Sequence, residues 1–259
     1  MKKTILFTLA LALITCFAFG QTSKKKTSTK TKKTTSTKTT TTTKAASSLT
    51  SLVPTISSLS EADVSKGLKE ALTAGVKTAS TSLNAPNGYF LNPEVKIPFP
   101  QEVIQVSTKL RALGMGKQVD QFEQTMNAAA ENAAIEAAPI FTQAITEITI
   151  TDAKDILTGK KDAATTYLQT KCTSPLTTAF TPHIKTALDK TLATQYWKDL
   201  TGYYNKLPLV TPVNTDLTQY TTGKALQGLF HIVAKEEIKI RDNSSLWSTT
   251  VMQQVFGAK

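Results

Sequence analysis

The fold is decided by the stretch VDQFEQTMNAAAENAAIEAAPIFTQAITEI, which spans residues 119–148. Its apolar residues and alanines recur at steps of three and four, the spacing that aligns side chains on one face of an α-helix. A second row of alanines, continued by Phe141 and Ile145, lies beside the first. The helix is therefore expected to be buried on two sides and to bend at Pro139, because proline cannot donate the helical hydrogen bond. We interpret this stretch as the central helix of an all-α protein.

Further helices are expected on both sides of this stretch, each marked by a capping residue or a helix breaker. Their expected bounds are Ser60 through Val76, Pro100 to Gly114, Thr151-Asp152 to Gly159, Asp162 through Leu168, Leu217 to Ile240, and Ser244 or Ser245 to Phe256. Residues 84–100 are the exception, because they contain Asn87-Gly88 and four prolines, and their two short apolar runs could pair as a hairpin. The sequence thus predicts one helical-bundle domain over residues 49–259, with a short extended or hairpin segment near 84–100.

The first twenty residues are typical of an export signal. Lys2 and Lys3 precede a short apolar run, and small residues stand one and three positions before Gln21. Cleavage is therefore expected after Gly20, which gives a periplasmic or secreted protein. A second interpretation makes Cys16 the lipidated first residue of an envelope lipoprotein. With cleavage before Gln21, Cys172 is the one remaining cysteine and no internal disulfide can form.

Residues 21–48 are expected to form a disordered tether. From Thr22 to Ser48 the chain holds only Thr, Ser, Lys and two Ala, so it has no apolar surface to bury. Its simplest role is that of a solvated spacer. The alternative is a weak, salt-sensitive attraction to an anionic envelope polymer or lipid surface.

The distribution of charge argues against nucleic acid as a partner. Ten of the 30 Lys and Arg residues precede residue 45, and the remaining 20 face 19 acidic residues, which leaves a formal charge of +1 on the rest of the chain. Arg111 and Arg241 are the two arginines, whereas readers of bases and phosphates favour arginine. After the export signal, no stretch is long and apolar enough to predict a membrane span.

Motifs for cofactors and metals are incomplete. The runs 113–117 and 158–161 resemble phosphate loops over a few residues but lack a required glycine or hydroxyl, so both are better explained as helix ends. Cys172 and His183 have no spacing that demands a catalytic pair. No cofactor and no metal site is therefore expected.

Two polar clusters fall on apolar helix faces. Asn127 and Glu131 continue into an alanine row, and Glu237 lies among apolar residues one turn before Arg241. A buried carboxylate must be paired or protonated, so Arg111 and Arg241 are expected to hold Glu131 and Glu237 in a structural network. The alternative is a catalytic carboxylate with a raised pKa.

Two aromatic pairs, Tyr196-Trp197 and Tyr203-Tyr204, stand seven residues apart. If one helix continues through Gly202, they place two aromatics on each of two faces. Core packing is the simplest interpretation, and a groove for apolar or sugar ligands is the alternative.

The chain from Leu59 to Gly257 resembles the bacterial family catalogued as domain of unknown function 4197. The similarity is carried, in order, by GLKEAL (67–72), KIPFP (96–100), LRALG (110–114), MNAAAE (126–131), TDAKDIL (151–157) with Gly159, DAAT (162–165), DL (216–217), GLF (228–230) with Glu236-Glu237, and VFG (255–257). The resemblance implies an exported, mostly helical protein and supplies no reaction, ligand or catalytic residue. One departure is that Ser244 and Trp247 stand where the family usually has proline and arginine.

Three functional hypotheses remain open. The first is an exported envelope protein with a binding or structural role, and the second is a carrier that holds a small apolar or lipid ligand in a cavity beside the alanine-rich helix. The third is an enzyme that uses Glu131 or Glu237. The sequence leaves the ligand, the partner and the oligomeric state open.

Overall fold

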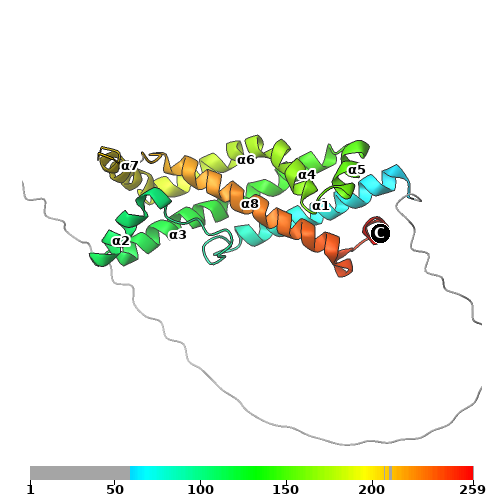
Figure 1. Ribbon diagram of the computed structural model, residues 1–259, viewed down its shortest axis with the longest axis horizontal. Coiled ribbons are helices and arrows are strands. Elements are labelled where there is room, and N and C mark those ends of the chain that lie inside the picture. The colour runs from blue at the N-terminus through cyan, green and yellow to red at the C-terminus, as the bar shows by residue number, and fades with distance from the viewer. Residues whose placement is uncertain (1–58, 207, 210–211, 259) are drawn as a thin grey trace, which may run out of the picture. The chain divides into compact units, whose positions relative to one another are not determined.

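The computed structural model describes residues 59–206, 208–209 and 212–258, and in these ranges every regular element is a helix. The predicted export signal (1–20) and tether (21–48) lie outside the described residues. The helices are α1 Glu61–Asn84, α2 Ile104–Ala112, α3 Gly116–Ala133, α4 Ala137–Thr146, α5 Ile150–Thr158, α6 Ala163–Lys190, α7 Ala193–Tyr204, α8 Leu217–Asp242 and α9 Thr250–Gly257 (Figure 1). The prediction of an all-α protein is confirmed.

The long helices α1, α3, α6 and α8 build the core. α6 packs against both α3 and α8, and α1 packs against α8 and the terminal α9 (Figure 1). Every fourth residue of α6 from Leu168 to Leu188 is buried, including Cys172 and Phe180. None of the described helices has both the length and the hydropathy needed to cross a membrane.

The predicted central helix consists of two helices rather than one. α3 ends at Ala133, a 3₁₀ turn covers Ala134–Glu136, and α4 begins at Ala137. The expected bend at Pro139 is therefore displaced toward the N-terminus. Proline has no N–H for the carbonyl one turn before it, and its ring crowds that carbonyl, so the strain falls on the preceding turn. Most alanines of the two rows are buried, as the pattern predicts, whereas Ala138 is partly buried.

Two predicted caps are displaced. α5 is capped by Thr149, which forms a capping box with Asp152, rather than by Thr151-Asp152. α9 is capped by Thr249, because Ser244–Leu246 forms a separate 3₁₀ turn. In both cases several hydroxyl residues stand close together in sequence, and tertiary packing selects among them.

Candidate functional site

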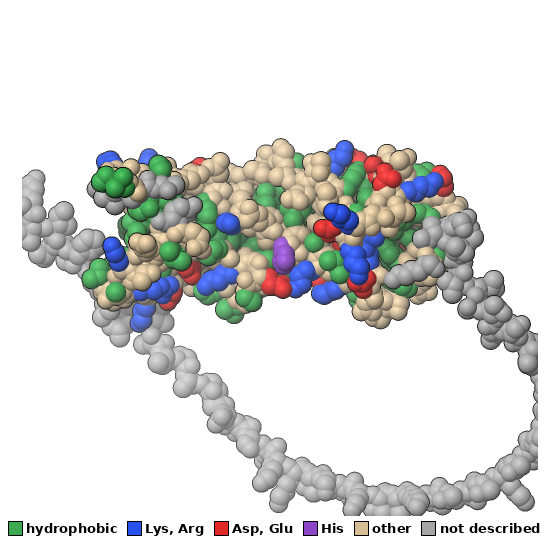
Figure 2. Space-filling model, viewed as in Figure 1, with side chains coloured by type: hydrophobic (Ala, Val, Ile, Leu, Met, Phe, Trp, Pro, Cys, Tyr) green, Lys and Arg blue, Asp and Glu red, His purple; other side chains and the backbone are tan. Residues whose placement is uncertain are grey.

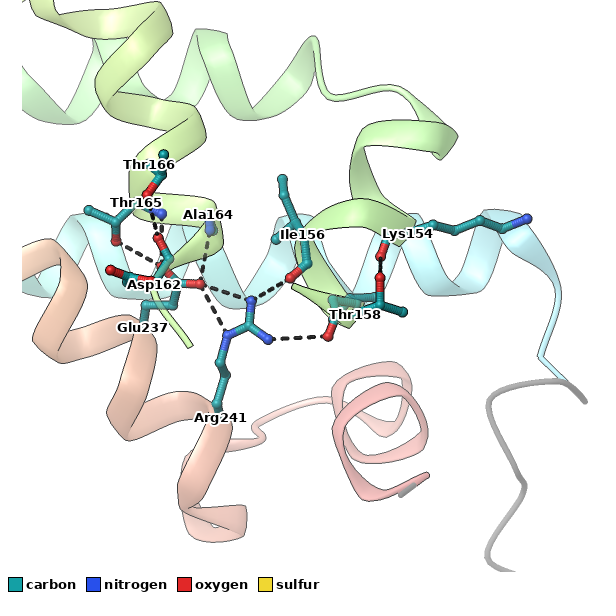
Figure 3. A network of polar contacts seen from close by, with 10 residues as sticks. Lys154, Ile156, Thr158, Asp162, Ala164, Thr165, Thr166, Glu237 and Arg241 are labelled. Atoms are coloured by element: carbon teal, nitrogen blue, oxygen red, sulfur yellow. Dashed lines mark hydrogen bonds and ion pairs between the residues drawn. The ribbon is translucent and has the colours of Figure 1, made fainter. Parts of the chain in front are cut away.

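The buried carboxylate of Glu237 lies at the start of α6 (Figure 3). One oxygen accepts hydrogen bonds from the Ala164 N–H at 3.0 Å and from Arg241, whose Nη2 is at 2.9 Å and Nε at 3.1 Å. The other accepts from the N–H and the hydroxyl of Thr165, each at 2.8 Å. The first N–H groups of a helix lack helical partners and favour negative charge. Since the N-cap residue Asp162 makes no side-chain cap bond, Glu237 supplies the cap from α8.

Arg241 binds the C-terminal end of the preceding helix, α5. Its Nη2 donates to the Ile156 carbonyl at 2.9 Å and its Nη1 to the Leu157 carbonyl at 3.5 Å, both in the last turn of α5. These carbonyls have no helical partners and favour a cation. Arg241 and Glu237 therefore hold the end of α5 and the start of α6 together, and we call this pair the α5–α6 clasp. Figure 3 shows both side chains directed at this junction.

Glu131 holds the turn after α1. Its Oε1 accepts from the N–H groups of Tyr89 at 3.1 Å and Phe90 at 3.2 Å, and its Oε2 accepts from the Asn87 N–H at 3.2 Å. Asn87 has a φ of 64°, so the turn forms a concave array of N–H groups that suits an anion. These N–H donors compensate the negative charge of the buried Glu131 carboxylate, and no arginine takes part.

Asn127, one turn before Glu131, holds the extended part of the same segment. Its Oδ1 accepts from the Ile97 N–H at 2.8 Å, and its Nδ2 donates to the Ile97 carbonyl at 2.9 Å and to the Glu123 carbonyl at 2.8 Å. The side-chain amide takes the place of a neighbouring strand. Of the extended or hairpin segment predicted near 84–100, the hairpin is wrong, because residues 85–96 form local turns and Ile97 bonds to the α3 side chain of Asn127 rather than to a second strand.

The predicted pairing of Glu131 with Arg111 is also wrong. Arg111 binds Asp120 at 2.7 Å on the surface, where their side chains are 41% and 61% exposed. The hydrogen bond and charge of Asp120 raise the pKa of Arg111. The network expected from the sequence is therefore two separate sites, one around Glu131 and Asn127 and one around Glu237 and Arg241.

The described members of the two aromatic pairs lie partly in the core and partly on the surface. Trp197 is buried, stacks on Phe122 with ring centroids 6.0 Å apart, and meets Phe99 edge-on at 5.9 Å. Tyr196 is 64% exposed, and Tyr204 is partly buried against the core. Since Tyr196 and Trp197 face different surroundings, they do not form the hypothesised groove together. The side chain of Tyr203 lies outside the described part of the structure.

The interior beside the α5–α6 clasp is tightly packed. A cavity of about 10 Å³ separates α1, α8 and α9, with Leu72, Val233 and Phe256 in its wall. A volume of this size holds about one water molecule. In the described part of the chain, no group of three His, Cys, Asp or Glu side chains is placed to bind a metal ion.

Cys172 and His183 do not form a reactive pair. Cys172 is buried in the core, whereas His183 is half exposed and lies 3.3 Å from the Glu136 carboxylate. Burial, and after it the negative charge of Glu147, raise the pKa of the Cys172 thiol to about 11. The thiol therefore stays protonated at mildly alkaline pH, and only the thiolate is nucleophilic.

We expect iodoacetamide to leave Cys172 unmodified in the folded protein at mildly alkaline pH and to alkylate it once denaturant is added. Peptide mass spectrometry measures both reactions on the same residue. Alkylation of the folded protein at the rate of the unfolded chain would contradict the buried, protonated thiol.

Gly88 allows the turn to approach α1 closely. A Cβ at this position would lie 2.4 Å from the Ser82 carbonyl oxygen and 2.6 Å from that of Leu83. Gly88→Ala is expected to lower the free energy of unfolding by about 2 kcal/mol, because backbone atoms cannot move aside. The control is Gly223→Ala in α8, where a Cβ meets nothing within 4 Å, and a gain of about 0.5 to 1 kcal/mol is expected from helix propensity. Chemical denaturation that changes the free energy of unfolding in the same direction for both variants would contradict the close approach of the turn to α1.

These contacts define an all-α protein in which both buried carboxylates bind backbone N–H groups of its own chain. The chain belongs to the family described as "Protein of unknown function (DUF4197)", whose model matches residues 58–257. A comparison with curated proteins and with solved structures found no match. Trp247, at the position where the resemblance implies arginine, donates its indole N–H to the Ile240 carbonyl at 2.6 Å and stacks on Phe256. It therefore caps the end of α8 and anchors α9.

Proposed function

We propose that this chain is an exported bacterial envelope protein whose role is binding or structural rather than catalytic. The structural hydrogen bonds of Glu131 and Glu237 carry this choice. Each carboxylate accepts three or more hydrogen bonds from the protein itself. A general base needs a free lone pair within reach of a substrate proton. The five hydrogen bonds to Glu237 leave none, and the three to the buried Glu131 involve both of its oxygens in holding the turn.

The other two hypotheses gain less support. A carrier needs an enclosed apolar cavity of some hundreds of Å³. The space beside the α5–α6 clasp measures about 10 Å³, and the hollow of about 540 Å³ beside α3, lined by Phe122, Ala128 and Tyr196, is open to solvent. An enzyme built on Glu131 or Glu237 would first have to break the hydrogen bonds that hold the turn after α1 or the start of α6. Native mass spectrometry of protein purified from its own envelope separates the classes, because a carrier retains a small molecule and a binding protein retains a partner.

Export is tested by the mass and location of the mature protein. We expect cleavage after Gly20, so the purified chain should begin at Gln21 and appear in the periplasmic or secreted fraction. Cys16→Ser is the discriminating variant. It leaves mass and location unchanged if cleavage follows Gly20, whereas it removes a diacylglycerol-modified form if Cys16 is the lipidated residue.

The tether is proposed as a spacer that also attracts anionic surfaces. Deletion of residues 22–48 should leave the Tm of the folded domain unchanged, because the segment offers nothing to pack. The same deletion should weaken the salt-sensitive binding of the chain to anionic vesicles. A drop of several degrees in Tm would contradict the spacer role.

A further inference from the structure

The turn between α2 and α3 exposes two large apolar side chains. Leu113 is 77% exposed and Met115 is 41% exposed, on either side of Gly114. Gly114 has a φ of 81°, and a Cβ built there meets nothing within 4 Å, so the turn projects into open solvent. We refer to residues 109–117 as the α2–α3 tip.

Basic side chains surround this apolar apex. The tip contains Lys109, Arg111 and Lys117 and no acidic residue. Asp120 of α3 neutralises Arg111, whereas Lys109 and Lys117 form no ion pair with any residue that the structure describes. Lys and Arg side chains lie beside apolar ones at the end of the molecule that carries α2 (Figure 2). The tip therefore combines local positive charge with exposed apolar surface on a chain region whose formal charge is close to zero.

This combination matches the surface of an anionic bilayer. Apolar side chains gain by entering the boundary between headgroups and acyl chains, and nearby lysines reach back to anionic headgroups. A polymer of sugar phosphates would neutralise the lysines but leave Leu113 in water. A stable protein interface needs a much larger buried area than two side chains provide.

We propose that the α2–α3 tip docks on phospholipid bilayers with anionic headgroups, with Leu113 and Met115 inserted at the acyl boundary. Lys109 and Lys117 bind the headgroups. This contact goes beyond the attraction proposed for the tether, because it belongs to the folded domain and depends on apolar insertion.

The first experiment locates the insertion. Leu113→Trp and the control Ile135→Trp are prepared in the full chain, since Ile135 is 56% exposed but lies beyond the other end of α3, about 27 Å along that helix. With vesicles of phosphatidylglycerol and phosphatidylcholine in equal parts, we expect a blue shift of emission and quenching by acyl-brominated lipid for Leu113→Trp only. No quenching, or equal quenching in both variants, overturns the proposal. A blue shift without vesicles also overturns it and indicates contact between copies of the chain.

The second experiment measures the apolar contribution. The double variant Leu113→Ser with Met115→Ser is expected to bind the same vesicles about tenfold more weakly, which corresponds to about 1.4 kcal/mol, while its binding to soluble polyphosphate stays unchanged. Both changes are at exposed positions, and an unchanged Tm verifies folding. Unchanged vesicle affinity overturns the tip as a docking site. Because the tether is identical in both proteins, its own attraction to the vesicles cancels in the comparison.

Discussion

Arg241→Met is expected to lower the free energy of unfolding by about 3 to 5 kcal/mol, because it leaves the buried Glu237 carboxylate without its charged partner. The substitution also removes the donors to the last carbonyls of α5. Glu237→Gln should produce a loss in the same range, since the guanidinium and the two N–H groups at the start of α6 then share one remaining acceptor oxygen. Urea denaturation followed by circular dichroism measures both changes.

Arg111→Met is the matched control for this prediction. It removes the other arginine of the chain, whose partner Asp120 lies on the surface. Exposed ion pairs contribute little to stability because solvent screens them, so the stability of this variant should equal that of the parent within error. Equal losses for Arg111→Met and Arg241→Met would show that burial does not distinguish the two pairs. The structural role of the α5–α6 clasp would then be refuted.

Glu131→Gln is expected to cost about 3 kcal/mol, because hydrogen bonds to a charged acceptor are lost and buried N–H groups are left unsatisfied. The amide NH₂ of glutamine faces at least one N–H donor of the turn and cannot accept from it. Hydrogen exchange gives a local measurement, and the amides of Tyr89 and Phe90 should exchange faster in the variant.

The control for Glu131→Gln is Glu136→Gln. Glu136 lies in the 3₁₀ turn between α3 and α4 and faces the half-exposed His183. Its substitution should leave both the urea midpoint and the exchange of Tyr89 unchanged. If Glu131→Gln also leaves the exchange of Tyr89 and Phe90 unchanged, the carboxylate does not hold the turn.

Sequence patterns predicted the contacts that depend on helical spacing. The burial of the alanine rows follows from steps of three and four residues, and Glu237 lies beside Arg241 because one turn separates them. The patterns did not predict the contacts in which a side chain binds a backbone group. Nothing in the residue types of 87–90 marks their N–H groups as donors to Glu131, so the sequence suggested an arginine as the partner instead.

Contacts between distant segments were missed for a related reason. Tyr89 is fully buried and its hydroxyl donates to the Ala225 carbonyl of α8 at 2.9 Å. Burial, and then the charge of Glu131, raise the pKa of Tyr89, so the phenol remains a donor. A Cβ on Gly228 would lie 3.0 Å from both Tyr89 and Val95. The only available signal was a tyrosine beside Asn87-Gly88, which predicts a turn but not its partner helix.

The α5–α6 clasp also has a consequence for the order in which the chain acquires structure. Its carboxylate follows the backbone groups that it caps by 72 and 73 residues. A ribosome releases residues 163–165 long before Glu237 and Arg241, so the start of α6 has no cap while the nascent chain is incomplete. Contacts that close such long loops form late in folding. The α5–α6 clasp can therefore form only after the C-terminal part of α8 has been synthesised.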